Sequence, residues 1–242
     1  MLSILQKEIR SFLSSLIAYI VVAAFLLAIG LFMWIYKDTN ALDYGAASLD
    51  TLFMMAPWVF IFLISAITMR SFAEEKKGGT IELLTTHPIT DWQIILGKFF
   101  AGLTLVVFAL LPTLLYYYTI YQLGSPKGNI DTGAMWGSYI GLLFLGGCYV
   151  SVGLFASSLT DNQIVAFILS AVLCFITFSV MGQLTGSFGT GKLNYYVEWL
   201  GIDYHYQSIS RGVVDTRDLV YFVSFIAVFL GLTKLSFGKR KW

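Results

Sequence analysis

Residues 132–160 read TGAMWGSYIGLLFLGGCYVSVGLFASSLT and contain no charged side chain. An α-helix rises 1.5 Å per residue, so about 20 apolar residues cross the roughly 30 Å hydrocarbon core of a membrane. The stretch exceeds that length. It therefore predicts a membrane-spanning helix over about residues 136–157.

The same pattern recurs along the chain. Charge-free windows also cover residues 11–36, 51–69, 99–126, 162–191 and 219–233. With 57% apolar residues, 12% charged residues and a mean hydropathy of +0.77, the 242-residue chain has too little polar surface for a soluble globule. We therefore predict an all-α integral membrane protein with one domain over residues 1–242. Its six spans are expected near residues 16–36, 52–69, 99–121, 136–157, 164–184 and 219–237.

The residues before the first span favour a helix that lies along the membrane surface. Its apolar face carries Leu2, Leu5, Ile9, Phe12 and Leu16, and its polar face carries Ser3, Lys7, Arg10 and Ser14. A helix divided in this way lies in the interface instead of crossing it. The alternative is that it extends the first span into water. The following apolar run is too long for a signal peptide, so we interpret it as a retained anchor.

The distribution of basic residues predicts the orientation. With the N-terminus in the cytoplasm, ten of the 15 Lys and Arg residues fall on the cytoplasmic side, in segments 1–15, 70–98 and 234–242, and five fall on the other side. Cytoplasmic loops retain an excess of positive charge during insertion. We therefore expect both termini and segment 70–98 in the cytoplasm.

Several kinds of chemistry are disfavoured. Residues 186–192 read GSFGTGK and match part of a phosphate-binding loop, but Leu193 stands where that loop needs Ser or Thr for magnesium. No His-Glu-x-x-His or Gly-x-Ser-x-Gly motif occurs, and the predicted spans lack the buried charges of ion-driven carriers. We expect no enzyme activity, no cofactor, no metal site and no nucleic-acid partner in this chain.

Residues 74–98, EEKKGGTIELLTTHPITDWQIILGK, form the one long charged stretch with helix-capping signals. A short helix is expected over 80–86, with Glu82 in its first turn, because Pro88 disfavours helical geometry in the residue before it. Residues 90–93, Thr-Asp-Trp-Gln, are a capping-box sequence that starts a second helix leading into the third span. From spacing alone, the segment fits a solvated loop as well as a lever for a soluble partner.

This segment resembles the coupling helix of permease subunits in the second exporter class of ABC transporters. The shared pattern consists of acidic residues, Gly-Thr, an apolar-acidic pair, two leucines and a proline. It comprises Glu74, Glu75, Gly79, Thr80, Ile81, Glu82, Leu83, Leu84 and Pro88, and Trp92, Gly97 and Lys98 match its tail. The resemblance implies that residues 80–86 sit in a cleft of a separate cytoplasmic ATPase subunit, which binds ATP and magnesium.

The resemblance extends over the whole chain. It implies a bacterial inner-membrane permease that pairs with a second copy or a similar subunit, contacts membrane lipid and couples ATP hydrolysis to transport or force transmission. It also implies short outer helices within residues 185–218. The N-terminal residues Lys7-Glu8 and Arg10-Ser-Phe and the run 25–34 most resemble the gliding-motility branch, which implies an auxiliary subunit with an extracytoplasmic domain. The alternative function is a membrane scaffold or assembly factor that docks a non-ATPase partner.

Small residues and prolines indicate how the spans pack. Glycines in the fourth span allow close approach of another backbone, either within the subunit or at a dimer interface. The candidates are Gly137, Gly141, Gly146 and Gly147. Pro57 and Pro112 fall within the second and third spans, where proline can kink a helix.

Overall fold

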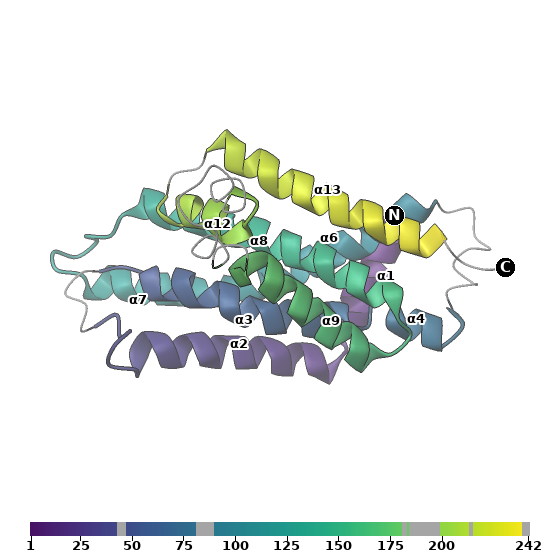
Figure 1. The fold of residues 1–242 in the computed structure, drawn as a ribbon. Helices are drawn as coiled ribbons and strands as arrows, with labels where there is room; N and C mark the ends of the chain where they lie inside the picture. The colour runs from purple at the N-terminus through teal and green to yellow at the C-terminus, as the bar shows by residue number, and fades with distance from the viewer. Residues whose placement is uncertain (43–46, 81–89, 181–182, 184–198, 213–214, 239–242) are drawn as a thin grey trace.

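The computed structural model describes residues 1–42, 47–80, 90–180, 183, 199–212 and 215–238, and the regular structure in these ranges is all helical (Figure 1). The helices before the long central one are α1 (Leu2–Leu13), α2 (Leu16–Trp34), α3 (Asp50–Thr68), α4 (Ala73–Lys77), α6 (Asp91–Leu110), the 3₁₀ turn η1 (Leu111–Thr113) and α7 (Leu114–Leu123). The remaining helices are α8 (Thr132–Leu159), α9 (Gln163–Phe175), the π-helix η2 (Ile176–Val180), α12 (Ile202–Ser210) and α13 (Thr216–Gly238).

Six helical units within the described ranges are long and apolar enough to cross a membrane, as the charge-free windows predict. They cover Leu16–Trp34, Asp50–Lys77, Asp91–Leu123, Thr132–Leu159, Gln163–Val180 and Thr216–Gly238. The third unit begins eight residues before the expected start near residue 99, because α6 continues through Lys98. This lysine is buried and does not mark the end of the apolar helix.

Side-chain caps determine where three of the long helices begin. The capping box predicted at the start of α6 is confirmed, since Thr90 Oγ1 accepts from the Gln93 N–H and Gln93 Oε1 accepts from the Thr90 N–H. Asp131 accepts from the backbone at the start of α8, and Asn162 does the same for α9. Each cap satisfies a backbone donor that a helix end leaves unpaired.

The two membrane prolines have different effects. Pro112 lies in η1, between α6 and α7, so the third span is interrupted by a tighter turn. Proline has no N–H for an α-helical hydrogen bond, and this accounts for the interruption. Pro57 lies inside α3, which continues as one helix from Asp50 to Thr68.

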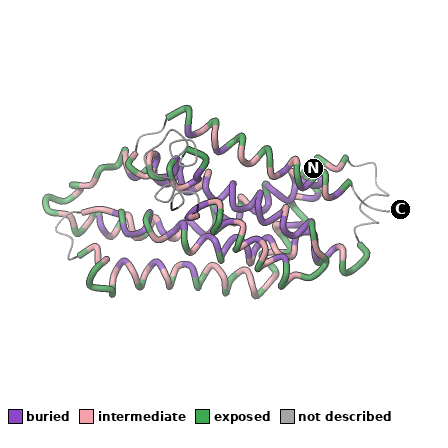
Figure 2. Tube along the Cα trace, in the orientation of Figure 1, coloured by how far each residue is buried: buried purple, intermediate pink, exposed green. Residues whose placement is uncertain are grey.

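Helix α8 is the centre of the bundle. In the most apolar 18-residue stretch of α8, 78% of the residues are buried. In the corresponding stretches of α2 and α13 the buried share is 17%. Helices α3, α6, α9, α12 and α13 all pack on α8, and Figure 2 shows the buried residues concentrated around it. The exposed surfaces of α2 and α13 are apolar, which suits contact with lipid or with another membrane helix.

The glycines of α8 lie against neighbouring helices of the same chain. A Cβ atom on Gly141 would lie 2.8 Å from Ile209 Cγ2 in α12, and one on Gly146 would lie 2.7 Å from Val106 Cγ1 in α6. Gly137 faces the backbone of Gly212, and Gly147 faces Ile226 in α13. These positions therefore permit close packing within the subunit.

The bundle has two distinct ends (Figure 1). We call the end that carries α1, α4, the start of α6 and the end of α13 the proximal end. The end that carries α7, α12 and the starts of α8 and α13 is the distal end. Of the outer segment 185–218 that is expected to form short helices, residues 185–198 and 213–214 lie outside the described ranges, and α12 is the short helix that the structure describes there.

Candidate functional site

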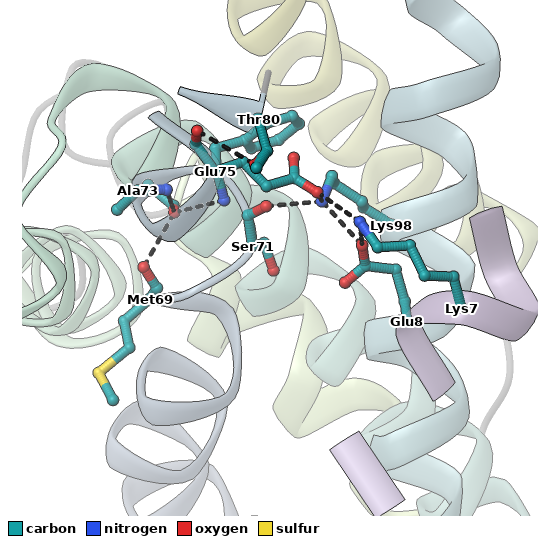
Figure 3. A network of polar contacts seen from close by, with 10 residues as sticks. Lys7, Glu8, Met69, Ser71, Ala73, Glu75, Thr80 and Lys98 are labelled. Carbon is teal, nitrogen blue, oxygen red and sulfur yellow. Dashed lines mark hydrogen bonds and ion pairs between the residues drawn. The ribbon is translucent and has the colours of Figure 1, made fainter. Parts of the chain in front are cut away.

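A buried ion network joins three helices at the proximal end (Figure 3). The Lys98 ammonium of α6 lies 2.9 Å from Glu8 Oε1 of α1 and 3.0 Å from Glu75 Oε1 of α4. It also donates to the carbonyl oxygen of Ser71 at 2.6 Å. The Lys98 side chain is only 1% exposed, so these three acceptors take the place of its hydration shell.

The network is electrically balanced by a second cation. Lys7 Nζ lies 2.9 Å from Glu75 Oε1 and 3.8 Å from Glu8 Oε1, so two lysines face two glutamates. Burial opposes charging of the Lys7 amine, but the hydrogen bond to Glu75 and the charges of both glutamates outweigh it. The pKa of Lys7 is therefore raised. Removing one member of such a buried set leaves an uncompensated charge, which costs far more than an exposed ion pair contributes.

A second junction fixes the break between α3 and α4. The Ser157 hydroxyl of α8 accepts from the N–H groups of Phe72 and Ala73 and donates to the carbonyl oxygen of Met69. These backbone groups belong to the turn between the two helices, where helical partners are absent. One side chain of the central helix thus holds the start of α4 in place.

Helix α4 is also tied to the end of α8. Lys76 donates to the carbonyl oxygen of Ser158, and the same oxygen accepts from Ser236 Oγ of α13 at 3.1 Å. Taken with the ion network, α4 is bonded directly to α1, α6 and α8, and through Ser158 it is linked to α13. This five-residue helix is therefore a contact point for four longer ones.

The sequence-predicted residues fall into two groups. Glu75 is a member of the ion network, Glu74 is exposed on α4, and Thr80 Oγ1 lies 3.4 Å from the Glu75 carbonyl oxygen. Gly79 has φ +66°, a left-handed conformation that favours glycine and lets the chain leave α4. The remaining predicted residues, Ile81, Glu82, Leu83, Leu84 and Pro88, lie outside the described ranges.

Sequence reasoning missed most of the network. Glu8 was noted only as part of an N-terminal dipeptide and Lys98 only as the tail of a loop pattern, and in the second junction Ser157 appeared only as the end of the fourth span. In the structure Glu8 lies one turn from Ile4 on the helix surface, and these are the two buried residues of α1. The sequence shows only that the two positions are one helical turn apart.

The distal end contains a cavity of about 920 Å³. Its wall combines aromatic rings with acidic groups, and it is bounded by α3, η2 and α12. Lining residues include Asp50, Trp58, Phe178, Asp203, Tyr204 and Tyr206. Burial raises the pKa of Asp203, and a hydrogen bond from Gln207 partly opposes this shift. The Tyr206 hydroxyl donates to the Phe53 carbonyl oxygen at 2.7 Å and so fixes α12 over α3.

Helix α12 is also held to α13 by a buried pair. His205 Nδ1 lies 2.7 Å from Asp218 Oδ1, and His205 Nε2 lies 2.8 Å from the Trp199 carbonyl oxygen. The ring is thus held between a carboxylate oxygen of α13 and a backbone carbonyl oxygen. Within the described residues, no group of His, Cys, Asp or Glu could hold a metal ion.

The structure has, within the described residues, six helical units long and apolar enough to span a membrane, and the short helix α4, which precedes segment 80–86 in the chain, is bonded to several of them. The sequence pattern described as "ABC-2 family transporter protein" matches residues 2–242, and the chain belongs to this family. The sequence-based expectation is thus confirmed at the level of an ABC-2 permease, the membrane component of an ABC transporter.

Two curated relatives from Escherichia coli, of strains K12 and O157:H7, are each described as "Probable multidrug ABC transporter permease YbhR". This chain is 28% identical to each over 127 residues, which is 52% of this chain and 32% of the relative. The chain therefore matches about a third of the length of these relatives.

Proposed function

We propose that this chain is the membrane-embedded subunit of an ABC transporter and that a separate cytoplasmic ATPase drives it by docking on residues 80–86. The observation that carries this proposal is the bonding of α4. This helix ends at Lys77, three residues before that segment, and contacts α1, α6 and α8 directly. A displacement of residues 80–86 is therefore passed to several spans without a long linker.

In this proposal the proximal end faces the cytoplasm of a bacterium, and the protein lies in the inner membrane. Ten of the 15 basic residues belong to sequence segments 1–15, 70–98 and 234–242, whose described parts lie at this end, in keeping with the excess of Lys and Arg on cytoplasmic loops. Both termini then lie in the cytoplasm, where ATP is available to the partner.

Six spans form half of a pathway, so a second copy or a similar subunit completes it. The apolar outer faces of α2 and α13 are available for that contact or for lipid. When two ATPases close, they move the two 80–86 segments. Each α4 then shifts the start of its α6 through the Glu75–Lys98 pair and the end of its α8 through Ser157.

The distal cavity is the proposed receiving site for cargo. Rings such as Trp58 and Tyr204 beside acids such as Asp50 and Asp203 suit an amphipathic molecule, and the matched E. coli relatives are described as probable multidrug permeases. Force transmission in a gliding-motility system, with an auxiliary extracytoplasmic subunit, is the second candidate. The N-terminal residues Lys7-Glu8 and Arg10-Ser-Phe favour it by resemblance.

The test is co-purification of the chain with candidate ATPases, followed by measurement of ATP hydrolysis. The double variant Glu82→Ala, Leu83→Ala is expected to lose ATPase binding. The matched control is Leu123→Ala, Lys127→Ala, which removes an exposed leucine and an exposed charge at the distal end and is expected to bind normally.

Retention of a non-ATPase protein on residues 80–86 would instead support the scaffold function. Normal ATPase binding by the Glu82→Ala, Leu83→Ala variant would contradict docking on this segment. Cysteine labelling from outside the cell tests the orientation separately: a cysteine at position 127 is expected to react and one at position 77 to remain protected.

A further inference from the structure

A crevice of about 390 Å³ opens at the proximal end between the α1–α2 connection and the end of α3 with α4. One wall is formed by residues of α1 and α2, and the other by residues from the end of α3 to Thr80. The crevice thus lies beside the ion network and shares Lys7, Glu8 and Glu75 with it.

Both walls change from apolar to polar in the same direction along the bundle. On one wall Val21, Ala18 and Ile17 are followed along the chain toward α1 by Ser15, Phe12 and Ser11, and then by the charged Glu8 and Lys7. On the other wall Ala66 and Ile67 are followed by Arg70, Ser71 and Glu74. The apolar part lies within the candidate spans Leu16–Trp34 and Asp50–Lys77, so it reaches into the depth of the membrane. A soluble protein cannot fill that part, whereas a phospholipid has the same gradient from acyl chain to head group.

Arg70 is the cation of the crevice that the protein does not neutralise. Lys7 is paired with Glu75 and Glu8, but Arg70 forms no ion pair with any described residue, and its Nε atom is buried without a hydrogen-bond partner. A buried guanidinium nitrogen without a hydrogen-bond partner is unfavourable. The planar set of donors of the guanidinium matches the oxygens of a phosphate group.

Two hydroxyls lie on the facing wall. Neither Ser11 nor Ser15 donates through its side chain to an acceptor among the described residues, and both line the crevice. They are therefore available to a phosphate held by Arg70. The crevice is also lined by Lys7 and by three glutamates, of which Glu8 and Glu75 are paired with lysines, so Arg70 is its one cation without an ion pair among the described residues. A cation between membrane helices can hold a lipid head group.

We propose that this crevice binds one membrane phospholipid, with the phosphate on Arg70 and the upper acyl chain against Ala18, Val21 and Ala66. The lipid joins the α1–α2 connection to the end of α3, so it stabilises α1 in the position that brings Glu8 to Lys98. The site does not depend on an ATPase, and its test is independent of the test of ATPase docking.

The experiment is native mass spectrometry of the full chain purified in mild detergent, with bound phospholipid counted per protein. The wild type is expected to retain one phospholipid. Arg70→Gln is expected to reduce the occupancy about tenfold or more, because a charge-assisted contact to phosphate is lost. Lys77→Gln removes an exposed charge on neighbouring α4 and is expected to retain the lipid.

A second variant addresses the apolar part of the site. Ala66→Phe fills the crevice while it leaves Arg70 intact, and it is expected to lower lipid occupancy as well. Thermal unfolding of delipidated protein provides a further readout: added phospholipid vesicles are expected to raise the Tm of wild type and Lys77→Gln but not of Arg70→Gln.

Three results would overturn the proposal. Equal lipid counts in wild type and Arg70→Gln would show that Arg70 holds no phospholipid. Displacement of the lipid by millimolar inorganic phosphate would indicate a free-anion site. If Arg70→Gln keeps its lipid but no longer associates with the ATPase, the crevice belongs to the contact with the partner protein.

Discussion

Lys98 and Glu8 are separated by 90 residues in the chain, and their side chains meet at 2.9 Å in the interior of the proximal end. The contact binds the N-terminal helix α1 to the start of the third span. Because Glu75 of α4 accepts from the same ammonium group, three segments depend on one lysine.

Lys98→Met is expected to destabilise the protein by about 3–5 kcal/mol, because it leaves Glu8 and Glu75 buried with only Lys7 to balance them. Thermal unfolding in detergent measures the effect. Lys77→Met, at an exposed position, is expected to stay within about 0.5 kcal/mol of wild type. The double variant Lys98→Met, Glu8→Leu should recover most of the loss, since one lysine then faces one glutamate. A double variant no more stable than Lys98→Met would contradict the pairing.

Ser157→Ala is expected to cost about 1–3 kcal/mol, because the N–H groups of Phe72 and Ala73 lose their acceptor in a buried turn. The adjacent Ser158→Ala is the matched control. Its hydroxyl donates to the Phe155 carbonyl oxygen of its own helix, and the Ser158 carbonyl oxygen that accepts from Lys76 is kept. Denaturation curves of the two variants should therefore separate clearly. Equal losses would show that the Ser157 hydroxyl does not hold the turn.

Gly141→Ala tests the close approach of α12 to α8. The new Cβ would lie 2.8 Å from Ile209 Cγ2, so the Ile209 side chain or α12 as a whole must shift, at an expected cost of about 1–3 kcal/mol. Gly231→Ala in α13 is the control, because no neighbouring atom lies within 4 Å of its added Cβ. That variant is expected to be unchanged or more stable by up to about 1 kcal/mol, from the higher helix propensity of alanine. A stable Gly141→Ala protein would contradict tight packing at this position.

The positions of the spans could be predicted from the sequence, because the charges are clustered and the charge-free windows between them are long enough to cross a bilayer. The start of α6 could also be predicted, since Thr90 and Gln93 lie three residues apart and form a local capping box. Such features depend on neighbours in the chain. They need no knowledge of how the helices are arranged.

The ion network could not be predicted from the sequence, because it depends on how distant segments of the chain pack together. Lys98 was expected at the edge of a loop, because a lysine in an apolar helix is unfavourable unless a partner is present. That partner, Glu8, comes from a helix whose placement no local pattern specifies. Glu75 was identified by its resemblance to a family pattern, and the structure gives it a contact that the pattern does not contain.

The raised pKa of Asp203 predicts a pH dependence at the distal end. Burial raises this pKa above 3.8, so the folded protein binds the proton more tightly than the unfolded chain. The contribution of Asp203 to the free energy of unfolding therefore falls as pH rises from about 3.8 through the folded-state pKa. Above that pKa the carboxylate is charged in both states, and the loss of stability no longer changes with pH.

Asp203→Asn keeps a side-chain acceptor for Gln207 and removes the charge. Its Tm is expected to exceed that of wild type near pH 7, and the difference should vanish below pH 3.8. Asp161→Asn, at an exposed position of the proximal end, serves as the control and should leave the Tm unchanged at both pH values. A wild-type advantage near pH 7 would contradict the assignment.

Glu75→Gln separates docking of the ATPase from transmission through α4. The change keeps the size of the side chain but removes the charge that Lys7 and Lys98 share, so α4 is held less firmly to α1 and α6. We expect the ATPase to co-purify normally, because residues 80–86 are intact. The effect of the permease on ATP hydrolysis should fall about fivefold or more, the size of a coupling free energy of 1 kcal/mol or above.

Glu74→Gln is the matched control for this experiment, since Glu74 is the exposed neighbour on the same helix and forms no ion pair among the described residues. It should leave both ATPase binding and hydrolysis unchanged. Loss of ATPase binding in Glu75→Gln would place α4 within the docking surface itself. Unchanged hydrolysis would show that force reaches the spans by a route other than the Glu75–Lys98 contact, because this variant weakens that contact while leaving Ser157 and its bonds to Phe72 and Ala73 in place.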